Sequence, residues 1–353
     1  MQLMIKTAVI GAGQIAQQHL ACLSGLPEAR IVGVCDLSRS LAEAAAERYG
    51  VKAWFTDHAR MLAEAQPDIV HITTPAITHF QLAQDCLNAD AHVFLEKPAT
   101  AHFEEFTLLQ TLAEAKHKLL FEDYNYLFNE PVSRLLEWTK AGALGTVVHV
   151  EALFCLNLLE NDHPFGDPNV RHPVLDLNGG IITDFLPHLA SLIYYFCGPV
   201  RSVRTLWEKQ TQASPFPFDE FRALLQADRA SASLFFSANS QPDLFRLTVF
   251  GSRAQATANI YENRLTRASM RPVPKPLIPF YNALEEAKLI RHSAWKLLWR
   301  KLSSGPGAHE GMWTLIRRVY ESIARETPPP ISPEDVFEVN RLVNELKKEE
   351  NKI

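Results

Sequence analysis

A glycine-rich turn close to the N-terminus is the first stretch whose residue types and spacing suggest chemistry. Gly11 and Gly13 follow the apolar run 7–10, and the small residue Ala16 completes the spacing G-x-G-x-x-A. The first glycine permits a tight turn, the second lets a pyrophosphate approach the backbone, and the small residue lets helix and strand pack closely. We therefore predict that the N-terminus of the following helix binds the phosphates of a dinucleotide.

An acidic residue follows the next apolar run, as this kind of site requires. Asp36 comes directly after Val34 and Cys35. A carboxylate at this point accepts hydrogen bonds from the adenosine ribose and repels a 2′-phosphate, so NAD is favoured over NADP. Arg39 offers a cation that would soften this preference. An ordinary strand-to-helix connection is the alternative, and the strand, the helix and Asp36 together disfavour it.

Three further residues have types suited to handling a proton on a substrate. Lys97 lies in the sequence FLEKP at 94–98, directly after the point where a parallel strand is expected to finish. A lysine there can hold a substrate oxygen by a charge-assisted hydrogen bond, although a surface lysine at a strand end is the common alternative. Asp184 and His188 follow Gly179 and Gly180 and are four residues apart, which places both on one face of a helix. Such a pair can accept and orient a proton.

These motifs together resemble the glucose-fructose oxidoreductase / inositol dehydrogenase / MocA (Gfo/Idh/MocA) family. The resemblance rests on Glu-Lys-Pro at 96–98, on HITTP at 71–75 followed by His79, and on the glycines before Asp184 and His188. It extends over nearly the whole chain. It implies an α/β fold with an N-terminal Rossmann domain and a C-terminal α+β domain with an open, mainly antiparallel sheet. That second domain would bind substrate and commonly form the contact of a homo-dimer or homo-tetramer.

The resemblance also assigns roles to individual residues. Lys97 would lie beside the nicotinamide and the substrate hydroxyl, His188 would accept the proton of the alcohol, and Asp184 would bind or orient substrate. Tyr126 is implied as a pocket residue, and core packing of this ring is equally compatible. The implied cofactor contacts are Gly11, Ala12, Gly13, Gln14, Ile15, Asp36, Arg39, Thr73, Thr74, Pro75, His79, Glu96, Lys97 and Asn125. The implied substrate contacts are Lys97, Tyr126, Arg171, Asp184 and His188.

Some positions depart from the family's usual pattern. Leu186 and Ser191 stand where the family often has glycine and aspartate, and Leu127 stands where an arginine is common. Of a Trp-Arg pair that often precedes the glycines, only Arg171 remains, after Val170. The resemblance therefore implies the class of reaction and does not imply which substrate is bound.

The implied activity is hydride transfer between NAD(P) and a hydroxyl-bearing carbon of a sugar, cyclitol or sugar derivative, nucleotide-linked sugars included. Two alternatives remain open. One is a catalytically silent regulator that binds dinucleotide and sugar, which retention of Lys97, Asp184 and His188 disfavours. The other is an enzyme of lyase or glycosidase type with an internal redox cycle. Neither a metal site nor nucleic acid is part of the prediction.

The elements that must position these residues follow from apolar periodicity. Up to Asp123, short apolar runs alternate with amphipathic segments, which is typical of βαβ units around a parallel sheet. We predict strands at 7–10, 31–36, near 53, 68–73, 92–95 and 119–122, with helices between them that include 41–49 and 103–116. We expect the Rossmann domain to span 1–123 and the second domain to span 124–353.

The second domain shows strands in series, which suggests an antiparallel sheet. Predicted strands are 146–154, 203–207, 221–226, 231–236, 246–250 and 256–261, with helices at 131–141 and after Gly180. Pro272, Pro274, Pro276 and Pro279 predict an extended segment. Further helices are predicted at 284–302, 311–326 and 333–349, the last with Ser332 as N-cap and Pro333 in its first turn.

The segment 284–302 is basic and amphipathic, and its role stays open at this point. Its apolar stripe is expected to pack on its own domain or on a subunit partner. Alternatives are a contact for the phosphates of a nucleotide-linked sugar and a membrane-surface patch. The cationic residues of the segment are Lys288, Arg291, His292, Lys296, Arg300 and Lys301, and the apolar ones are Leu284, Ile290, Ala294, Trp295, Leu298 and Leu302.

Composition is that of an ordinary globular protein of two domains. The chain has 353 residues, 47% of them hydrophobic and 21% charged, and a formal net charge of -5, which argues against general nucleic-acid binding. No secretory leader or membrane span is predicted. The five cysteines form no CxxC pair and are expected to be buried thiols, which favours the cytoplasm.

Overall fold

The chain folds into two compact units, which we describe separately. The computed structural model describes residues 4–158, 172–212, 214–302 and 309–348. One unit comprises Met1–Tyr124 with Met312–Arg341, and the other comprises Asn125–Gly311 with Leu342–Ile353. The division after Tyr124 lies next to the expected one at Asp123. The segment Met312–Arg341, which we expected in the second domain, groups instead with the first unit.

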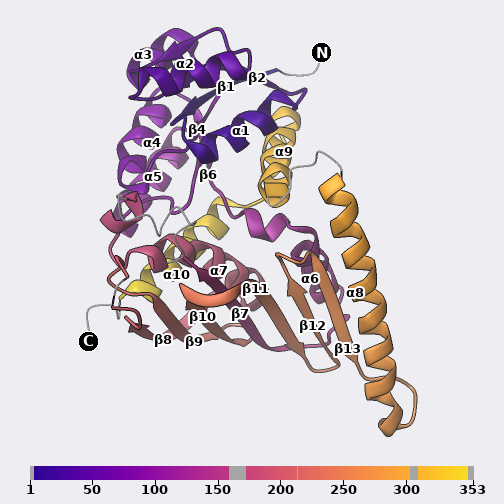
Figure 1. Ribbon diagram of the computed structural model, residues 1–353. Helices are drawn as coiled ribbons and strands as arrows, with labels where there is room; N and C mark the ends of the chain where they lie inside the picture. The colour runs from indigo at the N-terminus through magenta and orange to yellow at the C-terminus, as the bar shows by residue number, and fades with distance from the viewer. Residues whose placement is uncertain (1–3, 159–171, 213, 303–308, 349–353) are drawn as a thin grey trace. The chain divides into compact units, whose positions relative to one another are not determined.

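The first unit is built on a six-stranded parallel sheet (Figure 1). Its order is β3-β2-β1-β4-β5-β6, which confirms the predicted Rossmann class. The strands are β1 (Ile5–Ile10), β2 (Ala29–Cys35), β3 (Trp54–Phe55), β4 (Ile69–Ile72), β5 (His92–Leu95) and β6 (Leu120–Glu122). The helices that connect them are α1 (Gln14–Ser24), α2 (Arg39–Arg48), α3 (His58–Ala65), α4 (His79–Asn88) and α5 (Phe103–Ala115).

The central strands of this sheet are apolar on both faces because helices cover both. All four residues of β4 are buried, and so are Val93, Phe94 and Leu95 of β5. A strand buried on two sides shows a continuous apolar run rather than an alternating one, and this is why the sequence located these strands closely. The strand ends then carry the polar residues that concern function.

Two C-terminal helices complete this unit. They are α9 (Glu310–Arg325) and α10 (Pro333–Lys347), and the part of α10 up to Arg341 belongs to it. Tyr320 of α9 is fully buried, and its hydroxyl lies 2.8 Å from the hydroxyl of Thr7 on β1. The predicted cap of α10 is confirmed, because the Ser332 hydroxyl accepts the backbone N–H of Asp335 at 3.0 Å.

The second unit contains a seven-stranded sheet of order β13-β12-β11-β7-β10-β9-β8. Only β7 and β10 pair in parallel, and all other neighbours are antiparallel, which confirms the predicted open, mainly antiparallel class. The strands are β7 (Val147–Asn157), β8 (Val200–Glu208), β9 (Glu220–Ala227), β10 (Ser231–Ser237), β11 (Asn239–Gly251), β12 (Ala254–Asn259) and β13 (Arg264–Ser269). Strand β13 was not predicted, because its sequence RLTRAS holds little apolar alternation.

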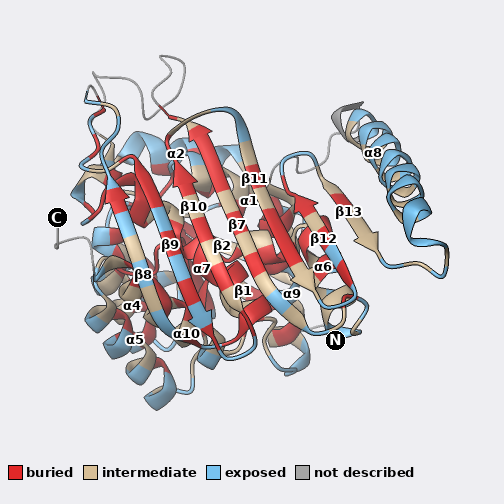
Figure 2. Ribbon diagram, turned by 90° about the horizontal axis from the view of Figure 1, so that it is seen from below, coloured by how far each residue is buried: buried red, intermediate tan, exposed pale blue. Residues whose placement is uncertain are grey.

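One face of this sheet is covered and the other is open. The helix α7 (Ile181–Cys197), thirteen of whose residues are buried, packs on β7, β9 and β10. A second helix, α6 (Glu130–Lys140), lies against β12 and β13. Figure 2 shows the strands from the open side, where buried residues alternate with exposed ones along β9 and with partly buried ones along β10. The alternation is the pattern of a sheet that faces a core on one side.

The proline-rich segment before α8 (Ile278–Leu302) corrects one prediction. We expected an extended stretch, but Lys275–Leu277 forms a 3₁₀ turn and the helix begins at Ile278, six residues earlier than predicted. Pro279 lies in the first turn, where its missing N–H costs no hydrogen bond. The side chains of Arg300, Lys301 and Leu302 lie outside the described residues. Within the described ranges, no helix combines the length and the apolar character that crossing a membrane requires.

Candidate functional site

The glycine turn connects β1 to α1, as predicted. Gly11 has a φ of +96°, and a Cβ at this position would lie 2.9 Å from the backbone of Thr73. Glycine is therefore required here by the left-handed backbone and by the close approach of the next strand end. Thr73 reinforces that approach, because its hydroxyl donates to the carbonyl oxygens of Ile10 and Gly11 at 3.1 Å.

Gly13 serves a different purpose from Gly11. It is the N-cap of α1, makes no side-chain cap, and a Cβ there would meet nothing within 4 Å. Gly13 and Gln14 are exposed, Ile15 is half-buried, and Ala16 is fully buried. The first N–H groups of α1 thus face open space at the positive end of the helix, which fits a pyrophosphate.

Asp36 is held by the same turn. Its carboxylate accepts the backbone N–H of Ala12 and that of Ser38, both at 2.8 Å. Two oxygens that each accept one bond retain further acceptor capacity for ribose hydroxyls. The side chain of Arg39 is 72% exposed, lies 5.1 Å from the ring of Trp54 and pairs with Glu43 at 3.7 Å. Its cation is therefore accessible on the surface beside Asp36.

The residues after β4 form a second edge of this region. Thr74 is half-buried and its hydroxyl accepts from that of Thr78, while Pro75 is exposed before a short 3₁₀ turn. His79 is fully buried, and its ring nitrogens lie 2.8 Å from the carbonyl oxygen of Thr74 and 3.1 Å from that of Pro98. Burial lowers the pKa of His79, against the effect of these carbonyls. Its imidazole therefore ties two loops together rather than facing outward.

Glu96 and Lys97 follow β5 and differ sharply in exposure. Glu96 is 7% exposed, and its Oε1 lies 2.9 Å from Nε2 of His19. Its Oε2 accepts the backbone N–H of Lys97 at 3.3 Å. Burial raises the pKa of Glu96, but the hydrogen bond from His19 and the charge of Lys97 outweigh it and keep that pKa below its usual value. Lys97 itself is half-buried.

A chain of buried hydrogen bonds leads to Glu96. Its members in order are Thr7, Tyr320, His71, His19 and Glu96, with contact distances of 2.8, 3.0, 2.9 and 2.9 Å. Burial and the neighbouring His19 hold the pKa of His71 well below its usual value, so its ring is neutral and has one N–H. When Tyr320 donates to His71 Nε2, His71 Nδ1 donates to His19 and His19 Nε2 donates to Glu96. Tyr320, His71 and His19 then donate toward the carboxylate, while the Thr7 hydroxyl donates to the carbonyl oxygen of Ile5 at 3.3 Å.

Two more buried carboxyls lie at the end of β6, Glu122 as its last residue and Asp123 directly after it. Glu122 accepts from the N–H of Ala99 at 3.1 Å and from the Tyr124 hydroxyl at 2.5 Å, and burial raises its pKa to about 7. Asp123 is 2% exposed, and its Oδ1 has no hydrogen-bond partner within the described ranges. Burial and the charges of Glu96 and Glu122 raise the pKa of Asp123 well above its usual value, against Lys97.

The second unit presents Asp184 and His188 on α7. Gly179 and Gly180 have φ of +81° and +58°, so two left-handed residues turn the chain into the helix. Asp184 is half-buried and His188 is 5% exposed. Pro187 lies inside the helix, which nevertheless continues to Cys197. Because Asp184 and His188 are four residues apart in one continuous helix, they share a face, as the sequence predicted.

Aromatic rings surround the imidazole of His188. The ring of Tyr126, in the 3₁₀ turn Asn125–Phe128, lies 4.7 Å from it in an edge-on arrangement. Phe185 and Phe154 lie at 6.2 and 6.3 Å. Tyr126 also packs at 4.6 Å against Phe245 of β11. The imidazole of His188 is thus packed among aromatic rings, whose shape restricts its orientation.

The last two predicted site residues are Asn125 and Arg171. Asn125 is half-buried, and its Oδ1 finds no hydrogen-bond partner in the part of the chain that is described. Arg171 lies outside the described residues. Leu186 and Ser191, where the chain departs from the family pattern, are buried inside the unit. The five cysteines are free and buried, as predicted.

Sequence reasoning missed four buried residues of the first unit, two in the hydrogen-bond chain to Glu96 and two at the end of β6. His19, Tyr320, Glu122 and Asp123 were given no role, although all are buried and polar. A signal was available for the last two, because Glu-Asp directly after an apolar run resembles the placement of Asp36 after β2. Tyr320 had no such signal. It lies 249 positions from its partner His71.

Two family models cover most of this architecture. The model of the oxidoreductase family with an NAD-binding Rossmann fold matches residues 5–124. The model of the GFO/IDH/MocA C-terminal domain matches residues 132–257. Together they cover more than half of the chain, and their order is that of the two sheets. The chain belongs to the Gfo/Idh/MocA oxidoreductase family, and its first unit carries that family's NAD-binding Rossmann fold.

The chain is also similar to proteins with assigned activities. It is 31% identical over 144 residues to D-glucoside 3-dehydrogenase from Escherichia coli, which covers 40% of this chain and 41% of that protein. It is 31% identical over 161 residues to glycosyl hydrolase family 109 protein 2 from Akkermansia muciniphila, over 42% of this chain and 34% of that protein. The chain thus matches less than half of the length of either relative.

A solved structure extends the likeness of fold to nearly the whole chain. The WlbA dehydrogenase from Bordetella pertussis, in complex with NADH and UDP-GlcNAcA, has a TM-score of 0.81 and 17% sequence identity. The match covers 99% of this chain and 96% of that one. At this identity the likeness establishes the fold, and the chemistry must be argued from this chain's residues.

Proposed function

We propose that the protein is an NAD-dependent oxidoreductase that acts on a CH–OH group of a sugar, cyclitol or sugar derivative. The observation that carries this proposal is the open N-terminus of α1 beside Asp36, together with a half-buried lysine at the end of β5. The relatives named above as a dehydrogenase and a glycosyl hydrolase both act, by name, on sugar derivatives. A sugar-like substrate is therefore the chemical class we favour.

The cofactor would be bound by the glycine turn and its surroundings. Backbone N–H groups from Gly13 to Ile15 would bind the pyrophosphate, and Asp36 would accept the ribose hydroxyls. NAD is preferred over NADP because the Asp36 carboxylate repels a 2′-phosphate, while the exposed Arg39 moderates that repulsion. When bound, NAD supplies the acceptor for the hydride that leaves the substrate carbon.

Proton handling falls to this chain's own side chains. In our proposal His188 Nδ1 or Nε2 accepts the proton of the substrate hydroxyl, and Lys97 stabilises the oxygen by a charge-assisted hydrogen bond. Asp184 orients a second hydroxyl or the imidazole. Glu96 fixes the backbone of Lys97 through its N–H. The same groups serve the reverse reaction, in which His188 returns the proton.

The decisive experiment follows NADH absorbance with free sugars, cyclitols, uronic acids and nucleotide sugars. Wild type and Lys97→Met are compared, and NAD binding is measured separately by calorimetry. Turnover that disappears in Lys97→Met while NAD still binds supports the proposal. Substrate loss without net NADH would instead identify an internal redox cycle of lyase or glycosidase type. NAD binding with no product in any assay would favour a regulator that binds without catalysis.

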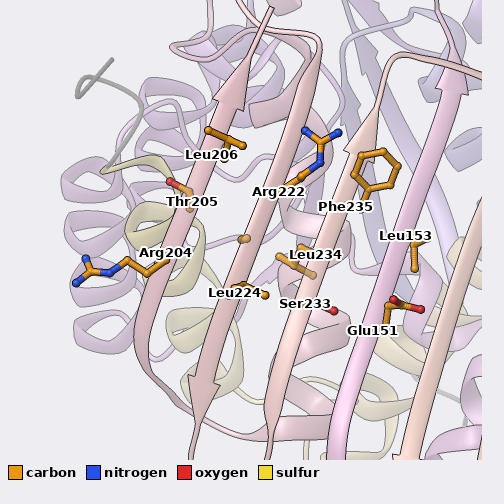
Figure 3. A pocket seen from close by; sticks show the side chains of 11 residues that line it. Glu151, Leu153, Arg204, Thr205, Leu206, Arg222, Leu224, Ser233, Leu234 and Phe235 are labelled. Atoms are coloured by element: carbon orange, nitrogen blue, oxygen red, sulfur yellow. The ribbon is translucent and has the colours of Figure 1, made fainter. Parts of the chain in front are cut away.

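We propose further that the protein is a homo-oligomer joined through the open face of the second sheet. A hollow of about 680 Å³ lies on that face over β8, β9 and β10. Leu206 and Leu224 are 44% and 66% exposed there, and Arg222 lies between Leu206 and Phe235 (Figure 3). Exposed leucines on a sheet face are covered by a partner at low cost in polar desolvation. Light scattering on Leu224→Arg should show a smaller mass than wild type, and an unchanged mass would exclude this face.

The cytoplasm is the compartment we propose. All five cysteines are free and buried, and burial raises the pKa of Cys35 to about 11 and of Cys22 to about 12. Such thiols are unreactive but persist best in a reducing compartment. Fractionation of cells that express the tagged chain would test this, and recovery from an oxidising compartment would contradict it.

A further inference from the structure

The helix α8 packs on its own unit through polar residues. Arg271 forms an ion pair with Glu285, and Lys296 forms one with Glu130 of α6. Asn282 donates to the carbonyl of Ser269 on β13 at 3.2 Å. Of the two predicted packing modes of the apolar stripe, the one on its own domain is wrong, because ion pairs and hydrogen bonds hold the other side of α8 to the unit.

The opposite side of α8 is apolar and exposed. Phe280 is 59% exposed, Leu284 54%, Trp295 60%, Leu298 50% and Trp299 70%. Successive positions are separated by four, eleven, three and one residues, which at about 100° per residue places all five within one face of the helix. Figure 2 shows α8 beside β13 with exposed residues along most of its length. A surface helix usually has the reverse arrangement, with its apolar face toward the core.

Cations share this exposed apolar face. Lys288, Arg291 and His292 are exposed and fall among the aromatic positions by helical spacing. The carboxylates of the helix lie elsewhere, since Glu285 pairs with Arg271 and Glu286 lines a hollow together with residues of β12 and β13. Among the described side chains of α8, the outward face thus combines large apolar groups with positive charge only.

We propose that α8 binds the surface of a membrane that contains anionic lipids. Its aromatic and leucine side chains enter the boundary between headgroups and acyl chains, as interfacial helices of this composition do. Lys288 and Arg291 bury their aliphatic stems beside Trp295 and reach lipid phosphates with their charged ends. The helix lies on the surface rather than across the bilayer, in agreement with its charges. This inference goes beyond the proposed oxidoreductase activity and does not rest on it.

Charge favours an anionic lipid surface over a second copy of α8. A two-fold contact brings the same patch of both subunits together, so Lys288 and Arg291 would meet the same cations of the partner. Like charges in such a contact are unfavourable, and no carboxylate on the described outward face offsets them. An anionic bilayer instead attracts each of these cations. Each lysine or arginine near the surface raises the partition coefficient about fivefold.

The test is flotation of the full-length protein with vesicles, at low and at high salt. One set of vesicles contains phosphatidylcholine alone and the other contains phosphatidylcholine and phosphatidylglycerol in equal parts. Wild type should float with the anionic vesicles, and the double variant Lys288→Glu/Arg291→Glu should partition at least about 20-fold less. Circular dichroism and thermal unfolding verify that each variant is folded.

Two exposed leucines, one in α8 and one elsewhere, separate vesicle binding through α8 from non-specific hydrophobic binding. Leu298 of α8 is 50% exposed and Leu108 of α5 is 60% exposed. Leu298→Ser should weaken vesicle binding and Leu108→Ser should leave it unchanged. Failure of wild type to bind anionic vesicles would overturn the proposal, and so would equal loss in both leucine variants. A change of oligomeric mass in Leu298→Ser without any vesicle binding would assign the face to a second copy instead.

Discussion

Lys97 in the first unit and His188 in the second are fixed by different forces. Glu96, which fixes the backbone N–H of Lys97, ends a chain of four buried hydrogen bonds that begins at Thr7. His188 is instead surrounded by the rings of Tyr126, Phe154 and Phe185. Polar positioning depends on every partner, because one missing donor leaves a buried group unsatisfied. Aromatic positioning depends on shape and tolerates loss of a single polar atom.

The largest effect is expected from removal of the proposed base in the aromatic surroundings. His188→Asn should lower kcat by about 10²- to 10⁴-fold, because the substrate hydroxyl loses its proton acceptor. NAD affinity, measured by calorimetry, should stay at the wild-type value. His149→Asn on β7 provides the same substitution at a half-buried histidine that bonds Ser231 and Ser233. Equal kinetics for the His149 and His188 variants would remove His188 from the mechanism.

The glycine turn permits a second prediction that separates ligand binding from folding. Gly13→Ala should weaken NAD binding at least about tenfold, because its methyl group would occupy the space into which the pyrophosphate comes. Stability should change by only a few tenths of a kcal/mol at this N-cap. Gly11→Ala should instead lower the free energy of unfolding by about 1–3 kcal/mol, since its φ is +96° and Thr73 is close.

Gly50→Ala is the control for backbone strain alone. Its φ is +66°, and a Cβ there meets nothing within 4 Å. Urea denaturation of the three alanine variants and calorimetry with NAD measure the two effects separately. If Gly13→Ala binds NAD as wild type does, the phosphate does not approach this residue and the proposed cofactor contacts are wrong.

Most elements of the first unit could be predicted from the sequence, because the motifs that identify them are short and local. The glycine turn, Asp36 and the strand ends are read within a few residues of one another, and buried parallel strands are continuous apolar runs. The chain of hydrogen bonds to Glu96 could not be read in this way. Its central hydroxyl comes from Tyr320 in a helix that we expected in the other domain, and no local pattern pairs that residue with His71.

In the second unit, periodicity located most strands and the apolar stripe of α8, but it did not determine which side of α8 the unit covers. The apolar stripe was correct as a helical pattern, yet ion pairs of Glu285 and Lys296 hold the opposite face to the unit. A helical pattern defines which residues share a face and does not say which face the rest of the protein covers. Strand β13 was not predicted, because polar residues at a sheet edge show little apolar periodicity.

The pH dependence of stability tests the buried polar residues of the first unit without disrupting their packing. Burial raises the pKa of Glu122 to about 7, against hydrogen bonds from Tyr124 and Asn340. The folded protein therefore keeps a proton that the unfolded chain releases above its ordinary pKa of 4.5. This stabilisation is fully present below about pH 4.5, falls as pH rises and is lost above about pH 7, by roughly 3 kcal/mol in total.

Glu122→Gln should remove this contribution to the slope of unfolding free energy between pH 5 and about 7.5. Urea denaturation at several pH values measures the slope for wild type and variant. Asp123 contributes in the same direction and the buried His71 in the opposite one, so only the difference between the two proteins reports on Glu122. Parallel curves would show that Glu122 titrates alike in the folded and unfolded states.

The smallest effect is the most direct test of the contrast between polar and aromatic positioning. Tyr320→Phe removes a fully buried hydroxyl that bonds both Thr7 and His71, and should lower the free energy of unfolding by about 1–3 kcal/mol. Tyr126→Phe keeps the ring beside His188 but removes the hydroxyl that hydrogen-bonds Tyr261. Because Tyr261 is 38% exposed, this loss should cost about 1 kcal/mol or less. In a double variant, His71→Phe should add little further loss of unfolding free energy to that of Tyr320→Phe, because both changes break the same chain of hydrogen bonds. Additive losses in that double variant would show that the bonds act independently, and polar positioning of Glu96 would then be local rather than a property of the whole chain.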